Sequence, residues 1–130
     1  MSNLQLYHND MSSCSQKVRL VLEEKNLSWH GHHMNLRKGE TRSKEYISKL
    51  NENGVVPTLI DGDQIIIEST VIMEYLDERY PHPPLMPVDP VSRATNRQFR
   101  YRITRDLFSL SLKAESKEEE VALDAKNQIK

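Results

Sequence analysis

Apolar and polar residues alternate at the start of the chain, and the pattern then changes to a helical one. Leu4 and Leu6 are separated by polar side chains, which is typical of a half-buried strand. Over residues 14–25, apolar side chains return at the spacing of one helix face, with charged residues between them. Residues 28–36 predict a second strand, in which we expect Trp29 to be packed.

The next part of the chain predicts a second helix and a hairpin. Residues 43–50 indicate a short helix with Tyr46, Ile47 and Leu50 on its inner side. Two apolar runs then flank the Asp-Gly-Asp sequence at residues 61–63, which is typical of a tight turn. These runs predict a third and a fourth strand.

A third helix is expected directly after the hairpin, over residues 69–80. Its apolar spacing predicts that Ile72, Tyr75 and Leu76 are buried. The residues expected on its exposed face are Glu74, Asp77, Glu78 and Arg79.

The order of these elements narrows the fold class. The order is strand, helix, strand, then a helix, and then two strands and a helix. If the first two strands are parallel, they need a right-handed helical crossover between them. We therefore predict an α/β fold: a thioredoxin-like βαβ-α-ββα domain with a mixed four-stranded sheet and helices on both faces.

A proline-rich segment, residues 81–87, interrupts the helical pattern, because proline cannot continue a helix. Asp89 and Pro90 then suit an N-cap and a first helical position, and a long helix is predicted from there to about residue 112. The expected divisions are a thioredoxin-like domain at residues 1–80, a linker at 81–89, and the start of an all-helical C-terminal domain, apparently incomplete, at 90–130.

This last helix carries two stripes. Its apolar stripe would lack partners in an incomplete helical domain, which predicts association. Its basic stripe would suit an acidic partner, although a solvated helix face is the commoner explanation. The apolar stripe is Phe99, Ile103, Leu107 and Leu110, and the basic stripe is Arg93, Arg97 and Arg100.

Composition limits the partners and the location. The net charge of -1 gives no reason to expect nucleic acid as a partner. One cysteine cannot build a disulfide framework, and we find neither a signal-peptide pattern nor an apolar run of membrane-spanning length. We therefore expect a cytoplasmic protein that binds no nucleic acid and no membrane.

Ser12, Ser13 and Cys14 lie where the first strand passes into the first helix. Backbone N–H groups at a helix start favour an anion, so a thiolate in this loop would be stabilised, whether it belongs to Cys14 or to a bound ligand. Two plainer interpretations stay open: one of the serines is only an N-cap, or Cys14 is a small buried apolar residue.

A second candidate site lies around the hairpin. Pro57 stands at the mouth of a strand, and a cis peptide bond there would turn the backbone of Val56 outward to pair with an extended peptide. Glu68 and Ser69 end a strand and begin a helix, where free N–H groups suit a carboxylate. The plainer interpretations are an edge-strand proline and a simple N-cap.

The sequence Val-Pro-Thr-Leu at residues 56–59, followed by Ile-Glu-Ser-Thr at 67–70, resembles the glutathione-binding half of the cytosolic glutathione transferases. The resemblance extends from Leu4 to about Leu112. It implies a bacterial transferase that forms a homodimer and uses glutathione as co-substrate and no metal. The second substrate would be a small hydrophobic electrophile.

The Ser-Ser-Cys sequence resembles the zeta class of this family. That resemblance implies that Ser12 donates its hydroxyl to the glutathione sulfur, with Ser13 and Cys14 as neighbours or substitutes. Other members of the family use a tyrosine in the region of the first strand, so Tyr7 is an alternative donor to the sulfur. If Cys14 is exposed, thiol–disulfide exchange through a mixed disulfide is a further option.

The family resemblance also assigns roles around the hairpin. Val56 would pair by its backbone with the cysteinyl part of glutathione, and Pro57 would fix that geometry. Glu68 would take the ammonium group of the γ-glutamyl end, and Ser69 its carboxylate. Three cations could reach the glycine carboxylate, although a solvated charge is the plainer interpretation of each: Lys38, Arg42 and Lys44.

The proline-histidine-proline sequence around His82 resembles stringent starvation protein A, together with the residues on either side of it. Those bacterial proteins have this fold and associate with RNA polymerase. The resemblance implies an alternative function as a non-catalytic regulator, with His82 in the contact surface. We prefer the transferase, because the Ser-Ser-Cys-Ser loop suits a thiol and transferases carry a related connector.

Three histidines, His30, His32 and His33, raise the question of a metal site. His30 and His32 would share one face of a strand. No carboxylate or cysteine is near them in sequence to complete a site, so we expect an exposed strand edge and no metal.

Overall fold

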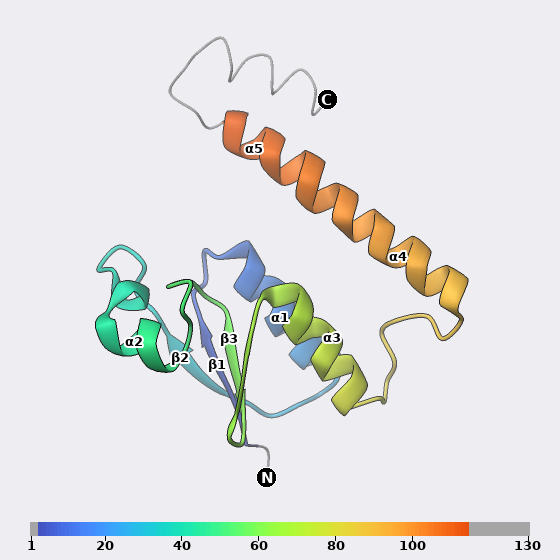
Figure 1. Cartoon of the computed structure of the whole chain (residues 1–130). Helices are drawn as coiled ribbons and strands as arrows, with labels where there is room; N and C mark the ends of the chain where they lie inside the picture. Colours follow the sequence, from blue (N-terminus) through green and yellow to red (C-terminus); the bar gives the residue numbers. More distant parts are fainter. Residues whose placement is uncertain (1–2, 115–130) are drawn as a thin grey trace. The chain divides into compact units, whose positions relative to one another are not determined.

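The computed structural model describes residues 3–114. The chain forms two compact units, which divide between Leu85 and Met86. The first unit contains a mixed sheet in the strand order β2-β1-β3-β4 (Figure 1). The strands are β1 (Leu4–His8), β2 (His30–His33), β3 (Thr58–Asp61) and β4 (Gln64–Ile67).

Pairing in the sheet follows the thioredoxin-like arrangement. Strand β1 runs parallel to β2 and antiparallel to β3, so Leu6 lies opposite both Gly31 and Leu59. Strand β3 pairs antiparallel with β4 across the turn at Gly62, which has the positive φ of 63° that glycine tolerates. The predicted fold class, topology and hairpin are therefore confirmed.

Helices cover both faces of the sheet. They are α1 (Ser13–Glu24), the 3-10 turn η1 (Glu40–Arg42), α2 (Lys44–Lys49) and α3 (Ser69–Arg79). Helices α1 and α3 lie side by side (Figure 1). Leu6 faces them, whereas the next side chain, Tyr7, points to the other face and meets Tyr46 of α2.

The core of this unit lies between the sheet and the α1–α3 pair. Apolar burial of this extent is the main stabilising contribution to such a domain. Trp29 packs against the core, as expected. The fully buried members are Leu4, Leu6, Val18, Leu22, Leu59, Ile72 and Leu76.

The expectations for the inner face of α2 and for the length of the second strand are wrong. Ile47 is 38% exposed, because its neighbour Tyr46 takes the inward position on α2. The second strand is shorter than residues 28–36, since the chain turns away after Met34, where the Nδ2 of Asn9 donates to the Met34 carbonyl at 2.8 Å. A turn follows, with the N–H of Lys38 donating to Asn35.

The segment after α3 is bonded back to α1. The ammonium group of Lys25 has no exposed surface in its side chain and lies 2.8 Å from the Oδ1 of Asp77. It also donates to the carbonyl groups of Tyr80, at 2.7 Å, and Pro83, at 2.8 Å. The N–H of Leu85 donates to the same Asp77 carboxylate at 2.9 Å. The expectation that Asp77 is exposed is therefore wrong.

The first helix of the second unit begins at the predicted residues. Asp89 is the N-cap of α4 (Pro90–Arg102), and its Oδ2 accepts from the N–H of Ser92 at 2.8 Å, which lowers the pKa of the Asp89 carboxyl. The helical chain then widens into a π-helical segment, η2 (Ile103–Phe108), and ends as α5 (Ser109–Ala114), instead of forming one regular helix.

The stripes of the fourth helix are only partly described. Phe99 is 63% exposed, in line with an unpartnered apolar stripe, but the side chain of Leu107 and residues 115–130 lie outside the described residues. Arg93 of the basic stripe donates to the Pro87 carbonyl at 3.2 Å. Within residues 3–114, no helix has the length and apolar character needed to cross a membrane.

Candidate functional site

A hollow of about 240 Å³ brings three separate segments of the first unit together. Its walls come from the first turn of α1, from the loop before β3 and from the junction of β4 with α3. Most of the predicted site residues line it, together with Val55, which the sequence did not single out. The lining residues are Cys14, Val55, Val56, Pro57, Glu68 and Ser69.

Cys14 brings a free thiol to this hollow, and its side chain is half-buried. Ser12 is the N-cap of α1, since its Oγ accepts from the N–H of Ser15 at 3.1 Å. The bond uses a lone pair of the hydroxyl and leaves its hydrogen available for donation. Ser12 can therefore cap α1 and also donate its hydroxyl hydrogen to a sulfur atom. Ser13 is exposed.

The loop before β3 contributes Val55, Val56 and Pro57 to the hollow. The peptide bond between Val56 and Pro57 is cis, which settles a point that the sequence left open. Val56 is 8% exposed and Pro57 is buried, so both residues are held in place by their surroundings.

Glu68 has an unusual backbone at the junction of β4 and α3. Its φ is 73° and its ψ is 118°, a conformation that costs a residue other than glycine about 1–3 kcal/mol. Its side chain does not cap α3; instead, its Oε1 accepts from the Nδ2 of Asn53 at 3.2 Å. A carboxylate and the N-terminal end of a helix therefore meet beside Ser69, which suits a ligand end carrying both an ammonium and a carboxylate group.

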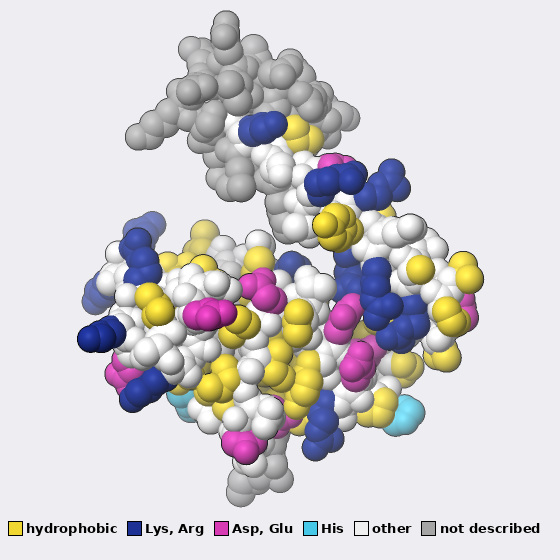
Figure 2. Space-filling view, in the orientation of Figure 1, with side chains coloured by type: hydrophobic (Ala, Val, Ile, Leu, Met, Phe, Trp, Pro, Cys, Tyr) yellow, Lys and Arg dark blue, Asp and Glu magenta, His cyan; other side chains and the backbone are white. Residues whose placement is uncertain are grey.

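The alternative candidates lie elsewhere. The Tyr7 ring stacks on His32 at 4.4 Å and meets the edge of Tyr46 at 5.9 Å, so its ring packs on the α2 face of the sheet. Lys and Arg side chains gather over α2 and η1 (Figure 2). The cations predicted for a glycine carboxylate belong to this part and are exposed: Lys38, Arg42 and Lys44.

The histidines of β2 make contacts with one another and with the sheet. His30 and His32 lie on one face, with ring centroids 4.7 Å apart, and His32 shares a hydrogen bond of 2.8 Å with Gln5. Burial, together with the nearby His30, lowers the pKa of His32. Among the described residues, no group of three or more His, Cys, Asp or Glu side chains could hold a metal ion.

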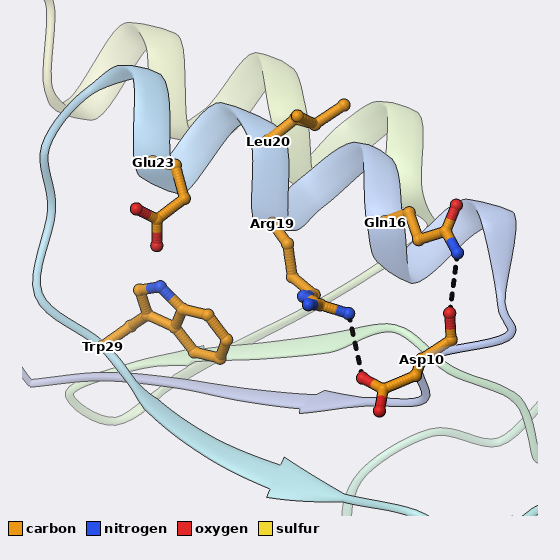
Figure 3. A pocket seen from close by; sticks show the side chains of 6 residues that line it. All are labelled: Asp10, Gln16, Arg19, Leu20, Glu23 and Trp29. Atoms are coloured by element: carbon orange, nitrogen blue, oxygen red, sulfur yellow. Dashed lines mark hydrogen bonds and ion pairs between the residues drawn. The ribbon is translucent and has the colours of Figure 1, made fainter.

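A larger hollow, of about 560 Å³, lies along the outer side of α1 (Figure 3). Its polar groups are largely paired with one another: Arg19 lies 3.1 Å from Asp10, and Gln16 donates to the Asp10 carbonyl at 2.6 Å. Trp29 forms part of its wall. It contains neither a thiol nor a hydroxyl, so the smaller hollow is the better candidate for thiol chemistry.

The fold and the smaller hollow define a class of protein: a thioredoxin-like domain with a thiol, a cis-proline and a helix start around one ligand-sized space. The family model for the glutathione S-transferase N-terminal domain matches residues 6–84. The chain therefore belongs to the glutathione S-transferase family.

The individual relatives are stringent starvation protein A homologs and glutathione transferases. A stringent starvation protein A homolog of Haemophilus influenzae is 40% identical over 99% of this chain and 59% of its own length. Glutathione S-transferase Z1 of Arabidopsis thaliana is 44% identical over 73% of this chain and 42% of its own length. The crystal structure of human glutathione transferase theta-2 with glutathione is 30% identical, with a TM-score of 0.75, over 80% of this chain and 43% of that one. The chain thus spans about half the length of these relatives.

Proposed function

We propose that the chain binds glutathione in the hollow beside Cys14. The observation that carries this proposal is the meeting of Val56, Pro57, Glu68 and Ser69 around one space. The Val56 backbone pairs with the cysteinyl part, with the cis bond to Pro57 fixing its direction. Glu68 takes the γ-glutamyl ammonium group, and Ser69 with the start of α3 takes the carboxylate. The relative solved with glutathione supports this choice of ligand.

Bound in this way, glutathione would place its sulfur near the start of α1. The Ser12 hydroxyl donates to the sulfur and favours the thiolate, with Ser13 and Cys14 as neighbours or substitutes. The thiol proton goes to solvent, and the thiolate forms a bond with a carbon of a small hydrophobic electrophile. In a substitution a leaving group such as chloride departs with the bonding electrons, and in an addition a π bond opens and the resulting anion takes a proton from solvent. Proximity supplies much of the rate increase.

The setting of this activity is also part of the proposal. The single cysteine is free, which suits a reducing compartment such as the bacterial cytoplasm. The exposed Phe99 suits a homodimer. If the Cys14 thiol reaches the bound sulfur, it can instead attack a glutathione disulfide, releasing one glutathione thiolate and keeping the other as a mixed disulfide.

Calorimetric titration with reduced glutathione tests the binding site. We expect saturable binding that weakens at least about tenfold in Glu68→Ala, because a hydrogen bond to a charged group contributes about 1.5–3 kcal/mol. Glu52→Ala removes another exposed carboxylate near the same loop and serves as the matched control. A folded wild-type protein that binds no glutathione, or an equal loss in both variants, would contradict the proposal.

A second candidate function is that of a non-catalytic regulator that binds RNA polymerase. The observation that favours it is the buried ammonium group of Lys25, which fixes the segment holding His82 and Pro83 against the first unit. Both of these residues are exposed. The identity of 40% with a stringent starvation protein A homolog supports this candidate too, because the resemblance to those proteins implies it. A surface fixed in advance loses less conformational entropy when a partner binds.

Binding of purified bacterial RNA polymerase to the fluorescently labelled chain tests this candidate. We expect His82→Ala to weaken binding while His30→Ala, which alters another exposed histidine, leaves it unchanged. Glutathione binding without polymerase binding favours the transferase, and the reverse result favours the regulator.

A further inference from the structure

The loop that carries Val56 is held by a buried network of side-chain hydrogen bonds, which no sequence pattern predicts. Its centre is Asn51, which is 1% exposed. The Nδ2 of Asn51 donates to the Val55 carbonyl at 3.1 Å and to the Thr58 hydroxyl at 3.0 Å, and its Oδ1 accepts from the N–H of Asn53 at 2.9 Å. One amide group thus bonds to three points of the loop.

A second buried group supports the same carbonyl. The hydroxyl of Tyr46 donates to the Val55 oxygen at 2.6 Å and lies 2.8 Å from the Thr58 hydroxyl. Burial raises the pKa of Tyr46, so this hydroxyl stays protonated and can donate. The Val55 oxygen therefore has two donors that are directed from within the domain.

This arrangement decides which way the next residue faces. A carbonyl fixed inward at Val55 sets the peptide plane between Val55 and Val56. In this trans peptide the N–H of Val56 points opposite to the inward Val55 carbonyl. Val56 itself lines the hollow, next to the cis bond with Pro57. Asn53, bonded through its N–H to Asn51, also donates from its side chain to Glu68, so the network reaches the opposite wall of the hollow.

We propose that Asn51 is a positioning residue for the peptide ligand: it orients the Val56 backbone, and through Asn53 it links that backbone to the Glu68 carboxylate. This inference rests on the proposed function, because the ligand it concerns is glutathione. Asn51 itself lies behind the loop and is not one of the residues that line the hollow.

The test compares glutathione affinities of folded variants by calorimetry. Asn51→Ala removes both donors and the acceptor, and we expect at least about a tenfold rise in Kd. Tyr46→Phe removes one donor and leaves Asn51 bonded to Val55, so a smaller rise is expected. Should Asn51→Ala fail to fold, Asn51→Asp keeps the shape and removes the donors when ionised.

A matched control separates positioning from general stability. Tyr75→Phe removes a hydrogen bond of comparable strength to Asp61, at the far end of the β3–β4 hairpin. It should lower the melting temperature but leave the Kd for glutathione unchanged. In addition, the amide resonance of Val56 should shift in Asn51→Ala without ligand, and its response to glutathione should shrink.

The possible outcomes are distinct. If wild-type protein binds glutathione and Glu68→Ala weakens binding, but folded Asn51→Ala binds as tightly as wild type, then the positioning role is wrong and the proposed function stands. If wild-type protein binds no glutathione, both proposals are overturned. An equal rise in Kd for Tyr75→Phe and Asn51→Ala would show that stability alone governs affinity.

Discussion

The ammonium group of Lys25 lies 2.8 Å from the Asp77 carboxylate, and the Lys25 side chain has no exposed surface. Asp77 retains 12% exposure. The pair joins the C-cap residue of α1 to α3, and Lys25 also bonds to the carbonyl groups of Tyr80 and Pro83. A buried charge with this set of partners is expensive to disturb, because removing one partner leaves the other without compensation.

Lys25→Met is therefore expected to destabilise the protein by about 3–5 kcal/mol. It keeps the apolar stem and removes the charge, so the Asp77 carboxylate and two carbonyl groups lose the ammonium group. Urea unfolding measures the loss. Lys49→Met is the control, since Lys49 forms an exposed pair with Glu45 at 3.7 Å, and it should cost less than about 1 kcal/mol. Equal losses of stability in the two variants would contradict the stabilising role of the buried Lys25 charge.

The Asp61 carboxylate accepts hydrogen bonds from two tyrosines, Tyr75 at 2.7 Å and Tyr80 at 3.3 Å. The bond to Asp61 raises the pKa of Tyr75 to about 12, from an ordinary value of 10.0. Between these two values, the unfolded chain loses the phenolic proton and the folded chain keeps it, so the free energy of unfolding should fall as the pH rises.

Unfolding experiments between pH 9 and about 11.5 check this expectation. Tyr75→Phe should lower stability by about 1.5–3 kcal/mol at pH 8, where the phenol donates to a charged group. Its stability should then decline less steeply at alkaline pH than that of the wild type. Parallel declines in the two proteins would exclude Tyr75 as the source.

His8 lies between Trp29 and His33, with ring centroids 5.5 and 5.7 Å away. Its Nδ1 is buried and has no hydrogen-bond partner among the described residues. Burial lowers the pKa of His8, and the nearby positive charge of Arg19 adds to the effect. A histidine whose pKa is lowered in the folded state contributes stability that is complete above the ordinary pKa of 6.5 and is lost as the pH falls.

Thermal unfolding from pH 8 to pH 5 should therefore show a decline on the acidic side of 6.5. His8→Phe keeps a ring between the same neighbours but cannot take up a proton, so its decline should be shallower. A variant that loses stability with pH as steeply as wild type would rule out His8 as a contributor.

Ser12 combines a cap and a proposed hydroxyl donor, and two substitutions separate them. Ser12→Ala should cost about 1 kcal/mol of stability through loss of the cap. Ser12→Asn retains a capping oxygen and should be nearly as stable as wild type. Both variants lack the hydroxyl, so both should add glutathione to a chlorodinitrobenzene more slowly, by at least about a hundredfold if a donor to the thiolate is lost. Full activity in Ser12→Asn would place the catalytic hydroxyl elsewhere.

Local periodicity was sufficient to predict β1, α1 and the β3–β4 hairpin, but it predicted neither the bounds of β2 nor the π-helical segment. The alternation around Leu6 and the helical spacing of Val18 and Leu22 each reflect one buried face, and a buried face leaves a direct trace in sequence. Adjacent apolar residues are harder to assign: Tyr46 and Ile47 both suited the inner side of α2, and only Tyr46 has a hydroxyl that reaches Val55.

Polar contacts between distant segments could not be predicted in the same way. Lys25 and Asp77 are far apart in the chain, and each alone has the appearance of a solvated charge. The bond between Asn53 and Glu68 likewise joins two loops. The cis bond before Pro57 was an open alternative, since sequence shows where a cis bond can occur and not which isomer packs.

The bonds of Lys25 also decide where the first unit can be cut. A gene fragment that stops with α3 at Arg79 would delete the carbonyl groups of Tyr80 and Pro83, and the ammonium group would then face Asp77 without two of its acceptors. Expression of this unit alone should therefore extend through Leu85, whose N–H bonds to Asp77. A fusion partner should be attached after Leu85. Attachment within the proline-rich segment would displace the carbonyl groups that accept hydrogen bonds from Lys25.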